Sequence, residues 1–312
     1  MVTKKPQSSG FSLQSFKKAK GGGSSGWRRH APRAGAPACT ADVPHNTIPP
    51  GHAGHCVMKL QVLGCAGGIG GRERLTTSLL VDDTILLDAG TGLTSLDVEQ
   101  LALIDHVFIT HSHLDHVAGL ALLVDAVQGR RTTPVTVHAT ERIVAALQRH
   151  LFNWVLWPDF AMIPDKTSPS MQWNIVDHGA TVQFKGCSLT SLPVNHTVGS
   201  AAYLVQNERS GFLFTGDMAS TPELWQAMRE EKRLSKIIVD CSFSDADKEL
   251  AARSMHFCPS SLIADIDAVP DAVEFLIYHL KPGQEELIMQ QLETGGRGRA
   301  FRALKCGDIF EF

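Results

Sequence analysis

Three histidines and one aspartate fall within six residues of the stretch ITHSHLDHVAG, residues 109–119. They are His111, His113, Asp115 and His116. Histidine is an uncommon residue, and imidazole nitrogens combined with carboxylate oxygens suit Zn²⁺ best, with Mn²⁺ and Fe²⁺ as alternatives. The stretch therefore predicts a metal site.

The spacing within this stretch divides the ligands between two ions. In an extended segment, side chains two residues apart point the same way, so His111 and His113 can converge on one ion. Asp115 and His116, at the start of a helix, can serve a second ion. Two ions about 3.5–4 Å apart lower the pKa of a bridging water, polarise a phosphoryl or carbonyl oxygen and clamp an in-line displacement. The pattern indicates hydrolytic chemistry.

Three further candidate ligands each follow an apolar run, as His111 follows VFIT. His196 follows LTSLPVN, Asp217 follows FLFTG and His279 follows EFLIY. Sites in layered α/β folds are commonly assembled from loops at one edge of the sheets, so we expect these side chains to meet. The first ion is assigned His111, His113 and His196, the second Asp115, His116 and His279, with Asp217 as the bridge.

Two neighbouring motifs are expected to support this site. Asp88, in LLDAGTG, is expected either to orient a ligand or to cap the following turn. The stretch GCAGGIGG, residues 64–71, lacks the G-x-G-x-x-G order and precedes a strand-like pattern, which argues against a dinucleotide site. Its glycines are expected to let the backbone approach the metal edge closely.

Apolar periodicity predicts the elements that carry these residues. Strands are expected at residues 59–63, 77–81, 84–88, 134–138, 181–184, 188–193, 201–206, 212–215, 237–241 and in part of 272–278. Helices are expected at residues 114–128, 141–151, 222–231, 259–266 and 282–292. The Asp82-Asp83 junction suits a tight hairpin. Strand clusters interleaved with helices indicate a layered α/β domain.

Residues 1–57 differ in composition from the rest of the chain. They carry eight lysines and arginines against one acidic residue, a net charge of +7, and are rich in Gly, Ser and Pro without a hydrophobic period. We expect a disordered basic tail there and a metallo-hydrolase domain at residues 58–312. The tail would fit an organelle transit peptide, and the alternative is that Met58 is the functional start.

The rest of the composition excludes other classes. The domain carries 21 basic and 31 acidic residues, a net charge of −10, which disfavours non-specific nucleic-acid binding. The seven cysteines are odd in number and form no C-x-x-C pair, which indicates a reduced compartment, and we expect a cytoplasmic protein. No run approaches the roughly 18 to 20 apolar residues of a membrane helix.

The segment HSHLDH resembles the H-x-H-x-D-H signature of the metallo-β-lactamase fold hydrolases. LLDAGTG, His196, FTGD and IYHLKPG follow in the order that this superfamily uses, over about residues 58–293. The resemblance implies a four-layer αββα sandwich. Within the superfamily, HLDH followed by VAGLALL, together with MHFCPSSL and YHLKPG, resembles the class II cyclic nucleotide phosphodiesterases, although residues 124–126 depart from their signature. That likeness implies hydrolysis of a 3′,5′-cyclic nucleotide, cAMP or cGMP, to the 5′-monophosphate.

The resemblance also implies cofactors and partners. We expect two divalent metal ions, with Zn²⁺ preferred over Mn²⁺ and Fe²⁺, and a small cyclic nucleotide as substrate. No stable nucleic-acid partner and no membrane association are expected, and a homodimer is compatible with the sequence. The alternatives are a ribonuclease Z-like tRNA 3′ endonuclease, which typically has glycine where Leu114 stands, a thioester or lactone hydrolase, and a metal-bound regulatory module without turnover.

Catalytic roles are assigned to Asp115 and to His256, in ARSMHFCP. Opening the cyclic ester expels a basic ribose alkoxide, and a histidine with a pKa near 6.5 is suited to protonate it. The alternative is that His256 only packs or caps beside Pro259. The aromatic residues of segment 152–173 are expected either to stack on the base or to pack in the core.

Overall fold

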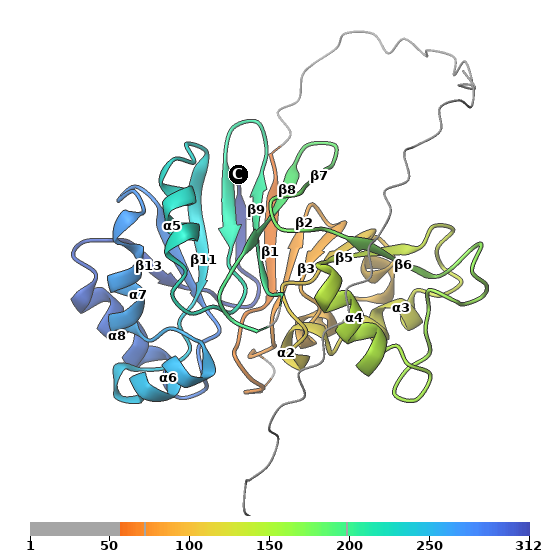
Figure 1. Cartoon of the computed structure of the whole chain (residues 1–312), viewed down its shortest axis with the longest axis horizontal. Helices are drawn as coiled ribbons and strands as arrows, with labels where there is room; N and C mark the ends of the chain where they lie inside the picture. The colour runs from red at the N-terminus through yellow and green to blue at the C-terminus, as the bar shows by residue number, and fades with distance from the viewer. Residues whose placement is uncertain (1–56, 72, 198) are drawn as a thin grey trace, which may run out of the picture. The chain divides into compact units, whose positions relative to one another are not determined.

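The computed structural model describes residues 57–71, 73–197 and 199–312 (Figure 1). The predicted basic tail falls, apart from Val57, outside the described residues. None of the helices in the described part of the chain combines the length and hydropathy that crossing a bilayer needs.

Two seven-stranded sheets form the centre of the described domain. The first runs, in spatial order, β14 (Ile309–Glu311), β1 (Lys59–Gly64), β2 (Ser78–Val81), β3 (Ile85–Leu87), β4 (His106–Phe108), β5 (Val135–Ala139) and β6 (Met171–Ile175). The second runs β13 (Phe301–Ala303), β12 (Glu274–Tyr278), β11 (Leu234–Asp240), β10 (Gly211–Phe214), β9 (Ala201–Gln206), β8 (Ser188–Pro193) and β7 (Thr181–Gln183).

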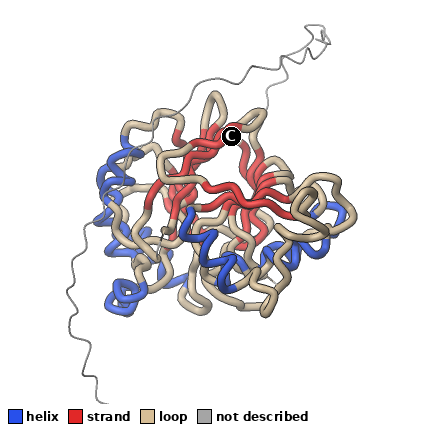
Figure 2. The backbone as a smooth tube through the Cα atoms, turned by 45° about the vertical axis from the view of Figure 1, so that its right-hand side comes forward, coloured by secondary structure: helices blue, strands red, loops and turns tan. Residues whose placement is uncertain are grey.

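Helices cover the outer faces of both sheets, and Figure 2 shows the strands inside them. The first half of the domain contains η1 (Thr91–Ser95), α1 (Val98–Leu101), α2 (Leu114–Val117), α3 (Leu120–Ala126) and α4 (Glu141–His150). The second half contains α5 (Pro222–Arg229), η2 (Asp245–Asp247), α6 (Lys248–Ser254), α7 (Pro259–Asp265), η3 (Ile266–Ala268) and α8 (Glu285–Gly295).

Alternation along the strands builds three buried layers. Leu79 of β2 and Phe212 of β10 point into the layer between the sheets. Their neighbours Leu80 and Leu213 point outward, into layers completed by α3 and α4 on one side and by α5, α7 and α8 on the other. Because successive strand residues face opposite sides of a sheet, an apolar strand buried on both faces fits only an interior sheet. The predicted four-layer αββα sandwich is confirmed.

The predicted hairpin and one predicted helix have different outcomes. Asp82 and Asp83 have φ of 47° and 60° and lie at the centre of a tight turn between β2 and β3, in which the Thr84 N–H donates to the Val81 carbonyl at 3.2 Å. The predicted helix 114–128 is wrong as a single element, because it breaks between α2 and α3. At the break, the Gly119 N–H donates to the Ala89 carbonyl at 2.7 Å, and a Cβ on Gly119 would lie 2.7 Å from the Gly90 oxygen. The loop after β3 therefore takes the space that a continuous helix with side chains would need.

Strand direction brings the predicted ligands to one edge. In the second sheet β8 and β10 are both antiparallel to β9, and β10, β11 and β12 are mutually parallel, so these four strands end at the same edge. His196, Asp217 and His279 follow β8, β10 and β12 respectively. In the first sheet, β3 and β4 are parallel, so Asp88 and His111 follow strands that end together.

The pairing of β1 with β14 extends to Met58 and Phe312 within the described residues. Met58 is 1% exposed, its N–H donates to the Phe312 carbonyl at 3.0 Å, and the Phe312 N–H donates back at 2.9 Å. A protein that begins at Met58 is therefore expected to match the full chain in turnover and Tm. A protein that begins at Gln61 is the control, because it loses Met58 and Leu60 from the core. A loss of more than about 1 kcal/mol in the Met58 protein, seen as a Tm lower by a few degrees, would contradict the expectation.

A buried histidine predicts how stability depends on pH. His138 of β5 stacks on Phe108 with ring centroids 4.2 Å apart, and its Nε2 lies 3.0 Å from Nδ1 of His106. Burial first, and then His106, lower the pKa of His138 to about 3. The unfolded chain takes up this proton near pH 6.5 and the folded chain does not, so stability is full above pH 6.5 and is lost as the pH falls below it.

The expected loss through His138 between pH 7 and pH 5 is about 2 kcal/mol. Urea unfolding at the two pH values measures it. In His138→Phe the loss should shrink, because the stack is kept and the titrating group is removed. His150→Asn, at an exposed position, should keep the wild-type slope. An unchanged slope in His138→Phe would show that the ring is protonated in the fold.

Candidate metal centre

The structure brings together the seven side chains that the sequence assigned to two ions. Five of them are buried: His111, His116, His196, Asp217 and His279. His113 is exposed and Asp115 is half-buried, so the cluster opens to solvent at the beginning of α2. The role of these residues as ligands stays a prediction.

Their ligand atoms fall into two groups that share one carboxylate. Within each group the ligand atoms lie within 4.8 Å of one another. The groups are His111, His113, His196 and Asp217, and Asp115, His116, Asp217 and His279. This division is the one that alternation along residues 111–116 predicted, and Asp217 occupies the bridging place.

Distances around Asp217 define the centre of the cluster. One carboxylate oxygen, Oδ2, lies 3.6 Å from Nε2 of His111 and 3.1 Å from Nε2 of His279. The other, Oδ1, lies 3.4 Å from Nε2 of His116. Asp115 closes the second group, because its Oδ2 lies 3.0 Å from Nε2 of His279. The two oxygens of Asp217 therefore face nitrogens of both groups.

Hydrogen bonds at the outer ring nitrogens fix the tautomers of two buried histidines. Nδ1 of His116 lies 2.7 Å from the Asp88 carboxylate, and Nδ1 of His196 lies 2.9 Å from the Met255 carbonyl. Both partners only accept hydrogen bonds, so each Nδ1 carries the proton. Each Nε2 then points toward the cluster, on the side of Asp217.

Hydroxyl groups act in the same way on the other two buried histidines. Thr110 donates its hydroxyl proton to Asp88 and so accepts from Nδ1 of His111, at 3.0 Å. Ser242 donates to Asp240 and accepts from Nδ1 of His279, at 2.7 Å. All four buried rings therefore turn Nε2 toward the cluster, which is the orientation that a metal-binding histidine needs.

Unpaired atoms and charge show that the cluster fits a cation. Nε2 of His111 and of His116 are buried without a hydrogen-bond partner among the described residues. Burial, reinforced by His116, lowers the pKa of His111 well below its ordinary value and keeps the ring neutral. Burial disfavours a charge on His116, but Asp217 and Asp88 outweigh it and raise its pKa well above the ordinary value. The second group therefore attracts positive charge, as a site for a divalent cation should.

The glycine-rich loop after β1 contacts this cluster as expected. A Cβ on Gly67 would lie 2.3 Å from the His279 oxygen and 2.6 Å from its Nδ1. His279 itself has φ of 62°, and its N–H donates to the Cys65 carbonyl at 2.8 Å. The absence of a side chain at position 67 therefore lets the loop hold a strained backbone directly behind a predicted ligand.

His256 lies beside the two groups and is hydrogen-bonded to Asp240, a residue that the sequence pattern did not single out. Its Nδ1 is 2.6 Å from Oδ2 of Asp240, and its ring centroid is 5.0 Å from those of His196 and His279. Burial disfavours the charged ring, but Asp240 raises the pKa of His256. Asp240 ends β11 and is fully buried, and the only signal for it in the sequence is an acidic residue that closes the apolar run IIVD.

Most of the aromatic segment predicted to recognise a base belongs to the core. Phe152 and Phe160 are 2% exposed, and Trp157 and Trp173 pack against the same apolar cluster. Trp154 alone of these side chains is largely exposed, at 63%. The packing alternative is therefore the correct one for four of the five aromatic residues.

Comparisons with known proteins agree with this geometry. The family model of the beta-lactamase superfamily domain matches residues 83–282. The 3′,5′-cyclic-nucleotide phosphodiesterase of Schizosaccharomyces pombe is 29% identical over 244 residues, 65% of this chain and 68% of that protein. Ribonuclease Z of Clostridium acetobutylicum is 27% identical over 161 residues, 49% of this chain and 51% of that protein.

A solved structure shares the fold. The crystal structure of unliganded yeast PDE1 matches with a TM-score of 0.67 at 17% sequence identity, over 79% of this chain and 96% of that one. The family match, the shared fold and the cluster of histidines and aspartates lead to one conclusion. The chain belongs to the beta-lactamase superfamily, has the metallo-β-lactamase fold and is a metal-dependent hydrolase.

Proposed function

We propose that the protein hydrolyses 3′,5′-cyclic nucleotides to 5′-monophosphates. The observation that carries the proposal is the placement of His256, held by Asp240, beside two ligand groups that share Asp217. Opening a cyclic phosphodiester needs activation at phosphorus and a proton for a basic alkoxide, and these two features are suited to those two tasks. The relative named as a cyclic-nucleotide phosphodiesterase supports the same substrate class.

The residues divide the work by position. In the proposal, His111, His113 and His196 would hold one divalent ion, Asp115, His116 and His279 would hold a second, and Asp217 would serve both. Bound ions supply charge neutralisation and Lewis-acid activation of the phosphodiester. Asp88, through His116 and Thr110, keeps the imidazole rings in the tautomers that binding needs.

The proton for the leaving group comes from His256 in this proposal. Its Nδ1 bonds to Asp240, so Nε2 is the nitrogen that can deliver a proton to substrate. Asp240 also accepts from Ser242, whose hydroxyl contacts Nδ1 of His279. Asp240 therefore orients His256 directly and His279 through Ser242, which fixes the positions of the two rings relative to each other.

An assay on four substrates tests the proposal against the ribonuclease alternative. The purified protein is incubated with cAMP, cGMP, bis(p-nitrophenyl) phosphate and precursor tRNA, and products are identified by chromatography. Turnover of a cyclic nucleotide to the 5′-monophosphate is expected. The net charge of −10 on residues 58–312 disfavours binding of a long polyanion such as tRNA. Cleavage of precursor tRNA without cyclic nucleotide turnover would overturn the proposal and favour the ribonuclease Z-like reading.

A further inference from the structure

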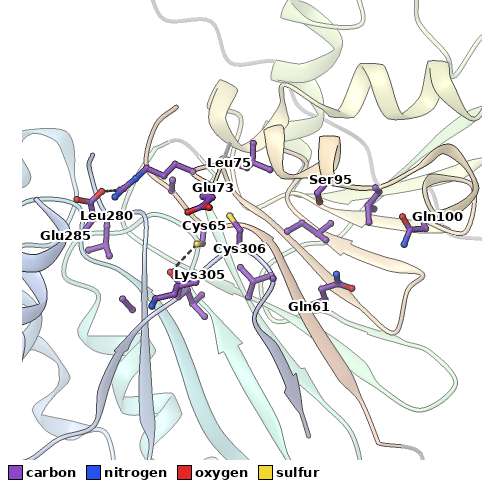
Figure 3. Close-up of a pocket in the computed structure, with 18 residues that line it drawn as sticks. Gln61, Cys65, Glu73, Leu75, Ser95, Gln100, Leu280, Glu285, Lys305 and Cys306 are labelled. Carbon is purple, nitrogen blue, oxygen red and sulfur yellow. Dashed lines mark hydrogen bonds and ion pairs between the residues drawn. The ribbon is translucent and has the colours of Figure 1, made fainter. Parts of the chain in front are cut away.

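A cavity of about 740 Å³ lies on the far side of the loop that holds His279. Its lining includes Cys65, Cys306 and Leu280, and it extends to Gln100 beyond η1 (Figure 3). None of the seven predicted ligands lines this cavity. The metal centre and the cavity therefore share a wall, built from the segments after β1 and β12, without sharing a site.

Two cysteines that are 241 residues apart in the sequence meet in that wall. Cys65 follows β1, and Cys306 lies in the connection between β13 and β14, where the Gly307 N–H donates to the Val62 carbonyl at 2.7 Å. The Cys65 thiol donates to the Leu304 carbonyl at 3.4 Å, and Figure 3 shows its sulfur beside the sulfur of Cys306. Both are reduced.

The two thiols differ in exposure and in reactivity. Cys65 is buried and Cys306 is half-buried at the cavity. The neighbouring Cys65 thiol, helped by backbone N–H groups of Leu75 and Cys65 against the effect of burial, lowers the pKa of Cys306 to about 6. The thiolate is the nucleophilic form of cysteine, so the accessible member of the pair is also the reactive one.

Cys65 is mechanically linked to the metal centre. Its carbonyl accepts the His279 N–H at 2.8 Å, and the next residue, Ala66, pairs with Leu280. The backbone at Gly67 also packs directly against His279, because a Cβ there would lie 2.3 Å from the His279 oxygen. A shift of the Cys65 backbone must therefore move His279, whose Nε2 faces Asp115 and Asp217.

We propose that Cys306 and Cys65 form an oxidative modification site for small hydroperoxides, and that closing a disulfide between them displaces His279. In the first step the Cys306 thiolate attacks the peroxide, ROOH, and one proton is taken up, which gives Cys306 sulfenic acid and ROH. In the second step the Cys65 thiol attacks the sulfenic sulfur, and the S–O bond breaks to release water and leave the disulfide. The peroxide is reduced by two electrons and the two thiols are oxidised to one disulfide.

Peptide mapping of the peroxide-treated full chain tests the modification itself. The metal-loaded protein is treated with hydrogen peroxide, blocked with iodoacetamide and digested. A peptide joining Cys65 to Cys306 is expected, and it should disappear after dithiothreitol. Absence of this crosslink, or irreversible sulfinic acid at Cys306 in its place, would overturn the proposal. This readout does not depend on which substrate the enzyme hydrolyses.

The second readout tests the coupling to His279. Turnover of bis(p-nitrophenyl) phosphate should fall by about 10- to 100-fold on oxidation, as expected when the support of a ligand is disturbed, and dithiothreitol should restore it. Cys306→Ser should keep the untreated activity and resist peroxide. A protein with Cys39→Ser and Cys56→Ser is the matched control and should be as sensitive as the wild type. A crosslinked protein that keeps full activity would overturn the coupling.

Discussion

Asp217→Ala is expected to lower phosphodiester hydrolysis by about 10³-fold or more, because an ion contributes several kcal/mol of charge stabilisation. The wild-type protein should hold about two divalent ions per chain, since two ion groups share this carboxylate. The variant should lose most of both ions, because each group loses the oxygen that faces its histidines. Elemental analysis of the dialysed protein, alongside activity on bis(p-nitrophenyl) phosphate, makes the measurement.

The variant His113→Ala tests the first ion group independently of the second, and His178→Ala is the matched control. His113 belongs only to the first group, so one ion should remain while activity falls steeply. His178 is an exposed histidine outside both groups, and its replacement should change neither ion content nor activity. Circular dichroism of each variant reports whether the fold is kept. Full activity of the wild-type protein after exhaustive chelation, with no ion detected, would contradict the binuclear site.

The site could be predicted where its chemistry is local in the sequence. His111 to His116 lie in one loop, and alternation in an extended segment already divides them into two sets. His196, Asp217 and His279 could be added because each follows an apolar run. Asp240 and Ser242 could not, because their roles depend on β11 lying between β10 and β12, and a single acidic residue at a strand end has several ordinary explanations.

Elements of the fold could be predicted where the apolar pattern runs over many residues. They were predicted wrongly where contacts with distant parts of the chain determine the backbone. Residues 188–193 and 201–206 form β8 and β9 as expected, because their apolar runs pack in the sandwich. The break at Gly119 depends on the Ala89 and Gly90 backbone, which no pattern within 114–128 reveals. Three-residue strands such as β13 and β14 are too short to show a period and exist because a longer strand pairs with each.

The position of His256 supports the proposed catalytic role over a role in packing alone. A residue that only packs beside Pro259 would have no need of a buried carboxylate, yet Nδ1 of His256 lies 2.6 Å from Asp240. The ring also stacks on His279 at an interplanar angle of 18°. It therefore lies at the edge of the ion groups while offering no ligand atom to either group that contains Asp217. The proposed reaction needs a group that protonates the leaving oxygen, and this position suits that task.

His256→Ala is expected to lower turnover of cAMP by about 10² to 10⁴-fold, the usual contribution of a positioned general acid. The same variant should lose far less activity on bis(p-nitrophenyl) phosphate, because p-nitrophenolate is a weak base and leaves without a proton. Ion content should stay at the wild-type value, since no predicted ligand is removed. Rates on a series of aryl phosphodiesters make the comparison quantitative, because the defect should grow with the pKa of the leaving phenol. Equal losses on all substrates, or a loss of bound ions, would instead identify His256 as a group that supports His196 and His279.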